Sequence, residues 1–167
     1  MYRTGSPSWR FEHDNLHILH RALFVRDAAM LPVTALPEVP PRLIDDVPAI
    51  PAVVPEADRA AANRSSGAAA THAAYQAWSA APGRTSAPEH EFFPWQLVHD
   101  AAHDAAASLG RPVSDMDAVA HVLAVESRWS YLAGAECGVC SVAVARDSAA
   151  AGELVRKLFV SGYPAAA

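Results

Sequence analysis

The chain has 167 residues, a hydrophobic fraction of 51% and a mean hydropathy of +0.07. A chain of this length and composition can bury a full core, which excludes a disordered polar protein and predicts a single domain. The net charge is −5 and no cluster of Lys or Arg is present, so neither nucleic acid nor an anionic membrane is the expected partner. No run of about 18 apolar residues occurs, so we expect no membrane span.

The cysteines and the N-terminus indicate the compartment. Cys137 and Cys140 are the two cysteines of the chain, too few for a disulfide framework. Residues 1–15 lack the basic and apolar pattern of a secretory signal. The sequence therefore predicts a cytoplasmic protein.

The N-terminal third divides into a predicted helix and a proline-rich segment. Residues 11–31 contain no Gly or Pro and carry leucines at near-helical spacing, which predicts a helix. Seven prolines between 32 and 55 exclude a long helix there. The same segment carries Leu43, Ile44 and Val47, so it is too apolar for a solvated linker. We expect an extended arm that buries these side chains against the chain itself or against a partner subunit.

The remaining residues, 56–161, are expected to complete a helical bundle. The predicted helices cover 56–64, 68–80, 94–109, 114–133 and 137–160. The clearest boundaries are Pro94 and Gly110, because proline favours the start of a helix and glycine its end. No strand alternation is evident, so the predicted fold is a single all-α domain, a bundle of about four to five helices with an extended Pro-rich arm.

Eight histidines are many for this length, and several recur at helical intervals. Side chains three or four residues apart share one face of a helix. Imidazole nitrogens in such pairs can hold Zn or Fe, and carboxylates can complete the site. The candidate metal ligands are His17, His20, His99, His103, His121 and Glu126.

The order of these residues resembles that of the hemerythrin-like bundles, which hold a non-haem di-iron centre. The stretch FEHDNLHILH resembles the first helix of that family, His99-x3-His103 its HxxxH element, and His121-x4-Glu126 its last element. The family's bridging acid of the second helix is replaced here by Gln76. Counted along the predicted helices, His103 lies about seven residues before Gly110 and His121 about seven after Ser114, so we expect an antiparallel helix pair to bring the two to one level.

A second candidate site is the CxxC of Cys137 and Cys140. A thiolate at a helix start is stabilised by the helix dipole, so a dithiol redox centre is one interpretation and two buried, packed thiols are the other. The stretch CGVCSVAVARDSAAAGELV resembles the carboxymuconolactone decarboxylase and alkyl hydroperoxidase D family, in which a CxxC opens a helix. The family's relay histidine would fall at Val144, and its upstream Glu is matched out of register by Glu126.

These observations give three hypotheses of function. The first is a helical metal-binding protein with iron or zinc on His and carboxylate ligands. The second is a non-catalytic helical subunit that docks on a partner protein, as a homo- or hetero-oligomer held through the Pro-rich arm. The third is a dithiol oxidoreductase that uses Cys137 and Cys140. The sequence names no substrate, and whether the protein is an enzyme stays open.

Overall fold

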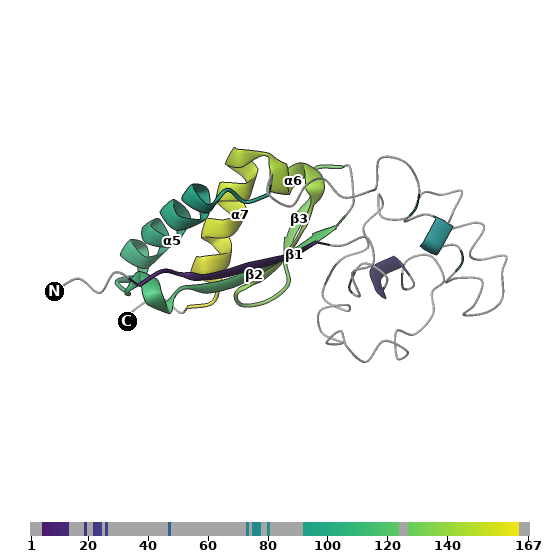
Figure 1. Cartoon of the computed structure of the whole chain (residues 1–167). Coiled ribbons are helices and arrows are strands. Elements are labelled where there is room, and N and C mark those ends of the chain that lie inside the picture. The colour runs from purple at the N-terminus through teal and green to yellow at the C-terminus, as the bar shows by residue number, and fades with distance from the viewer. Residues whose placement is uncertain are drawn as a thin grey trace.

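The computed structural model describes residues 5–13, 19, 22–24, 26, 47, 73, 75–77, 80, 92–123 and 127–163. Within them the chain is a mixed α/β fold, in which two long helices pack on a four-stranded sheet (Figure 1). The prediction of an all-α helical bundle is therefore wrong. Among the described residues no helix combines the length and apolar character of a membrane-spanning segment.

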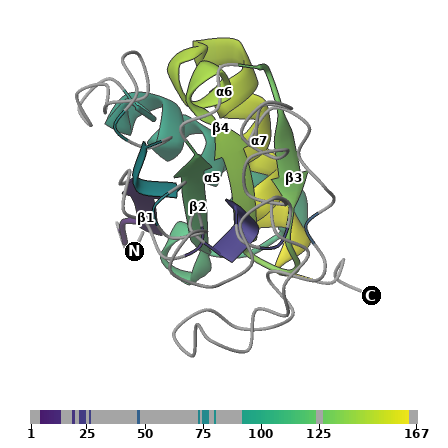
Figure 2. The same cartoon turned by 90° about the vertical axis from the view of Figure 1, so that its right-hand side faces the viewer.

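The sheet has the strand order β1-β2-β4-β3 (Figure 2). Its strands are β1 (Ser8–His13), β2 (Asp117–Leu123), β3 (Ser130–Leu132) and β4 (Cys137–Ser141). The first, second and fourth strands run parallel, and β3 pairs with β4 in the antiparallel sense. The register is fixed by pairs such as Phe11 with Ala120 and Val122 with Cys140.

The helices are α5 (Trp95–Leu109), α6 (Val142–Arg146) and α7 (Ser148–Ser161), with a short 3-10 turn at Val113–Asp115. In Figure 1, α5 and α7 lie side by side over one face of the sheet. The predicted helix 94–109 is confirmed at both ends, because α5 starts after Pro94 and stops at Gly110. Gly110 takes the left-handed conformation that ends many helices, with φ of 63°.

The core lies between this helix pair and the sheet. On β1 the aromatic rings of Trp9 and Phe11 point toward the helices, and Trp9 packs edge-on to Phe93 with ring centroids 5.2 Å apart. Trp9 also lies 5.9 Å from the ring of Phe159 on α7. Phe159 is fully buried, so the aromatic cluster joins the first strand to the last helix.

The predicted helix 114–133 is instead β2 and β3. Ala118, Ala120 and Val122 alternate along β2 and are buried against the helices, while Val119 and His121 between them face the other side. The alanines are small enough to let the helices approach the sheet closely. Alanine also has the highest helix propensity. Its recurrence in this segment therefore favoured the prediction of a helix where the chain forms a strand.

The predicted helix 137–160 begins too early. Residues Cys137–Ser141 form β4 in the middle of the sheet, between β2 and β3. Helix α6 starts only after Ser141, whose hydroxyl accepts a hydrogen bond from the Val144 N–H. Helix α7 starts after Asp147, whose carboxylate accepts from the Ala150 N–H at 2.9 Å. This hydrogen bond, together with nearby Arg128, holds the pKa of Asp147 below its usual value.

The predicted helix 11–31 also begins too early, because 11–13 belong to β1. Within the rest of that range Leu19, Ala22–Phe24 and Arg26 are helical. Of the predicted arm 32–55, only Val47 is described, and it is buried. Leu43, Ile44 and the predicted helix 56–64 lie outside the described residues. The predicted helix 68–80 is described at a few positions, of which Ala73 and 75–77 are helical.

Candidate functional site

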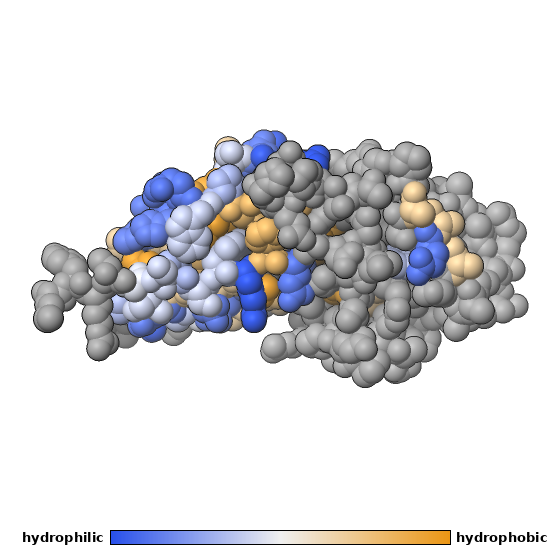
Figure 3. Space-filling model, in the orientation of Figure 1, coloured by the Kyte–Doolittle hydropathy of each residue, from blue (hydrophilic) through white to orange (hydrophobic). Residues whose placement is uncertain are grey.

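Two side chains of a type that can bind metals lie together on the exposed side of α5. His99 and His103 are one helical turn apart, and their Nε2 atoms are 3.2 Å from each other, a hydrogen bond in which one ring donates and the other accepts according to the tautomer. The two rings are tilted by 48° with centroids 4.3 Å apart. Both project away from the buried face of α5, which consists of Val98, Ala101, Ala102, Ala105, Ala106 and Leu109. In Figure 3 blue, hydrophilic side chains cover part of the surface over α5, with orange patches beside them.

The spacing of the two nitrogens matches that of two ligands on one metal ion. Zn–N bonds of about 2.0–2.1 Å at a tetrahedral angle put two bound nitrogens about 3.3 Å apart. His99 and His103 already hold their Nε2 atoms close to this distance. Among the described residues, no third His, Cys, Asp or Glu joins them in a cluster that could hold a metal. Helix α5 therefore offers two nitrogen ligands.

His121 does not belong to this site. It lies on β2 between Ala120 and Val122, both of which face the helices, so its imidazole projects from the opposite face of the sheet. There its Nδ1 is 3.4 Å from a carboxylate oxygen of Glu12. The structure thus does not bring His121 to His99 and His103.

The other predicted ligands are not described. His17, His20 and Glu126 lie outside the described residues. Glu12, the partner of His121, was missed because residues 11–31 were read as a helix. The alternation of apolar and charged residues in the sequence SWRFEH was the available signal, since it puts Arg10 and Glu12 on one face of a strand.

The two cysteines lie in a strand, not at a helix start. Because side chains alternate, Cys140 points into the core below the helices and Cys137 toward the opposite face. Neither forms a disulfide, and three residues of strand separate their Cα atoms by about 10 Å. A disulfide needs Cα atoms within about 7 Å, so forming one requires β4 to come apart. Burial raises the pKa of the Cys140 thiol to about 12.

This burial gives a direct prediction for alkylation. We expect Cys140 to react with iodoacetamide at pH 8 only as fast as the protein unfolds, because the thiolate is the reactive form and burial disfavours it. Since the folded pKa exceeds the unfolded one, stability should also fall as pH rises from about 9 toward about 12. Mass spectrometry of the labelled protein checks this, with Cys140→Ser to identify the slow thiol. Rapid labelling of Cys140 in native buffer would contradict it.

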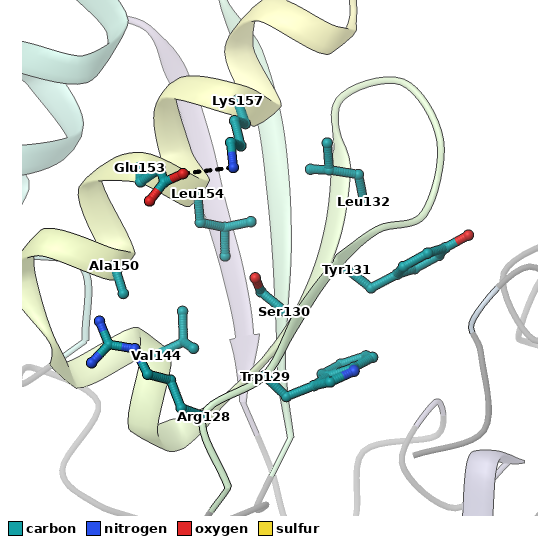
Figure 4. A pocket seen from close by; sticks show the side chains of 10 residues that line it. All are labelled: Arg128, Trp129, Ser130, Tyr131, Leu132, Val144, Ala150, Glu153, Leu154 and Lys157. Carbon is teal, nitrogen blue, oxygen red and sulfur yellow. Dashed lines mark ion pairs between the residues drawn. The ribbon is translucent and has the colours of Figure 1, made fainter.

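A groove of about 300 Å³ lies between the edge strand β3 and helix α7 (Figure 4). Ser130 and Leu132 point from β3 toward α7, whereas Trp129 and Tyr131 point away from it. The remaining lining residues are Arg128, Val144, Ala150, Glu153, Leu154 and Lys157. On α7, along one wall of the groove, Lys157 pairs with Glu153 at 2.6 Å, which lowers the pKa of Glu153. The groove has an apolar floor and a charged rim.

The same strand leaves backbone groups at an open edge. Ala133 and Trp129 are hydrogen-bonded to β4, through Ala133 N to Cys137 O and Ser141 N to Trp129 O. In an antiparallel pair the intervening residues turn their N–H and C=O groups outward. Ser130 and Leu132 therefore present free backbone groups beside the groove, and within the described part of the chain no strand pairs with this edge.

Comparisons with protein-family models, with curated proteins and with solved structures find no match to this chain.

Proposed function

We propose that this protein binds a divalent transition metal ion through His99 and His103, with zinc as the ion to test first. The observation that carries the proposal is the 3.2 Å separation of the two Nε2 atoms on adjacent turns of α5. Imidazole nitrogen is a common ligand for Zn, Cu, Fe and Ni. The hydrogen bond between the rings holds them together before a metal arrives, and a metal that binds both Nε2 atoms replaces this bond.

The surroundings of the pair suit a cation. Asp100 and Asp104 directly follow the two histidines on α5, and Gln96 donates a hydrogen bond to the Asp100 carboxylate at 2.8 Å. These carboxylates supply negative charge close to the site and add to the attraction for a divalent ion. Both imidazoles must be neutral to bind a metal, so lower pH weakens binding by competition with protons.

Removing either histidine should weaken zinc binding by at least about tenfold, because each supplies one of the two nitrogens that α5 offers to the metal. His99→Ala and His103→Ala are the test variants, and His121→Ala is the matched control on the opposite face of the sheet. Isothermal titration of zinc chloride into tag-free protein at pH 8 measures the affinity. An unchanged affinity in His99→Ala, or a loss in His121→Ala, would refute the proposed site.

A second candidate function is the docking of an extended partner segment on β3. The observation that favours it is the coincidence of the outward backbone groups of Ser130 and Leu132 with the groove beside α7. A strand added to a sheet edge gains affinity from main-chain hydrogen bonds and specificity from pockets for alternate side chains. Leu132 is 36% exposed, which is high for a large apolar residue.

Leu132→Pro should reduce such binding at least about tenfold, because proline removes an outward N–H and cannot pair at a sheet edge. Peptides selected on the wild-type protein from a random library provide the ligand, and fluorescence anisotropy measures their affinity. Tyr131→Phe, which keeps the backbone, is the control. Peptides that bind Leu132→Pro as tightly as wild type would exclude this edge as their site.

The proposal also includes the location of the protein in the cell and the role of the Pro-rich arm, residues 32–55. A cytoplasmic location is supported by Cys137 and Cys140, because two thiols outside any disulfide fit a reducing environment. Oligomer formation through segment 32–55 is supported by its apolar composition alone.

A further inference from the structure

Within the described part of the chain, His99 and His103 fill two positions of the ligand shell of the proposed metal site on α5. Zinc in protein sites is almost always four-coordinate, and the described part of the chain supplies two nitrogens and no third ligand. We infer that a second copy of this chain completes the shell with its own His99 and His103, so that one metal ion joins two antiparallel α5 helices. This inference rests on the proposed function, because it assigns the remaining ligands of the same site.

The spacing along α5 fits this arrangement. Trp95, His99, His103 and Ala107 follow each other at intervals of four residues and form one continuous stripe on the outside of the helix. A two-fold axis beside the midpoint of this stripe puts His99 opposite His103 of the second copy. The four imidazoles then surround the axis, where a single ion can bind them all.

The ends of the stripe are complementary in size. The same axis puts Trp95 opposite Ala107 of the second copy, which is the largest side chain against one of the smallest. Trp95 is 55% exposed and its ring centroid is 6.2 Å from that of His99. Covering this indole removes apolar surface from water next to the metal, which favours association. A water-completed site on a single chain would leave the indole exposed.

The charges make association depend on the metal. Asp100 and Asp104 lie on the flank of the stripe, and in an antiparallel pair of identical helices the same flanks meet. Four carboxylates therefore approach each other and repel. A divalent ion held by neutral imidazoles offsets this repulsion. The chain should consequently pair through α5 only when the metal is present.

The first experiment measures mass and stoichiometry together. Tag-free protein is titrated with zinc chloride at pH 8 and followed by sedimentation velocity and native mass spectrometry. We expect one zinc ion per two chains and a zinc-dependent doubling of mass, reversed by a chelator. His99→Ala should abolish both.

Two matched substitutions on α5 test the geometry. Ala107→Arg puts a long cation where the second copy's Trp95 must lie, and leaves both histidines intact. Ser108→Arg adds the same side chain 100° further round the helix, also at an exposed position, outside the stripe. We expect Ala107→Arg to lower the zinc affinity at least about tenfold and to stay monomeric, while Ser108→Arg behaves as wild type. Far-UV circular dichroism verifies that both variants are folded.

The outcomes separate the inference from the function on which it rests. One zinc per monomeric chain, lost in His99→Ala, would overturn the dimer and leave the proposed metal site standing. A zinc-dependent dimer that is insensitive to Ala107→Arg would overturn it too, because the chains would then meet at another surface. Absence of zinc binding in the wild-type protein would refute the proposed function itself.

Discussion

Replacing Phe159 by alanine is expected to lower the free energy of unfolding by about 3–5 kcal/mol. The ring is fully buried on α7 and packs against Trp9 of β1, with centroids 5.9 Å apart. Its removal deletes apolar contacts and leaves a cavity that the close-packed layers cannot fill. Because Trp9 and Phe159 lie at the two ends of the chain, the loss also uncouples the first strand from the last helix.

Urea denaturation monitored by circular dichroism measures this change. The control is Trp95→Ala in metal-free protein, which removes an even larger aromatic side chain from the exposed side of α5. That substitution should cost less than about 1 kcal/mol, as is usual for surface positions. Equal losses in the two variants would mean that α7 does not pack on the sheet through Phe159.

Gly138→Val is expected to destabilise the fold by about 1–3 kcal/mol, although valine favours strands and glycine does not. Gly138 lies in β4 directly below α7, and a Cβ at this position would be 2.9 Å from Leu158 Cδ2. Leu158 is fully buried, so its movement would disturb the side chains packed around it. The glycine therefore lets α7 approach the middle of the sheet.

A double-mutant cycle distinguishes this contact from a general effect of the substitution. Leu158→Ala alone should cost about 2–5 kcal/mol, but less in the Gly138→Val background, where the valine fills part of the cavity. Thermal or chemical unfolding of the four proteins gives the coupling energy. Strictly additive costs would show that Leu158 does not lie over Gly138.

Helix α5 is the element that sequence reasoning predicted best. Its boundaries follow from Pro94 and Gly110, whose effects on the backbone are local and independent of tertiary structure. Its two histidines were also placed correctly on one face, because helical spacing alone decides which side chains are neighbours. The bounds of α5 and the common face of its two histidines could therefore be predicted without knowledge of the rest of the fold.

The strands could not be recognised in the same way. The inner strands β2 and β4 are short and rich in alanine, cysteine and glycine, and buried segments of this kind lack the polar alternation of exposed strands. The positions of these small residues match the periodicity of a helix as well as that of a strand. Only the edge strand β1 shows a clear alternation, with Trp9 and Phe11 inside and Arg10 and Glu12 outside.

Because the strands were predicted as helices, the positions of His121 and of the two cysteines were also predicted wrongly. His121 was expected at the level of His103 because residues were counted along two antiparallel helices, whereas β2 rises about twice as far per residue and turns alternate side chains to opposite faces. The CxxC was read as a helix start for a similar reason. In β4 its two thiols face opposite sides of the sheet.

The most direct test of the metal site is a titration observed at the imidazoles themselves. Long-range ¹H–¹⁵N spectra of the assigned histidine side chains, recorded while zinc chloride is added at pH 8, report which nitrogens bind. We predict that Nε2 of His99 and Nε2 of His103 shift together and saturate at the same zinc concentration, while the resonances of His121 stay in place. Binding at other histidines with no change at His99 and His103 would contradict the account.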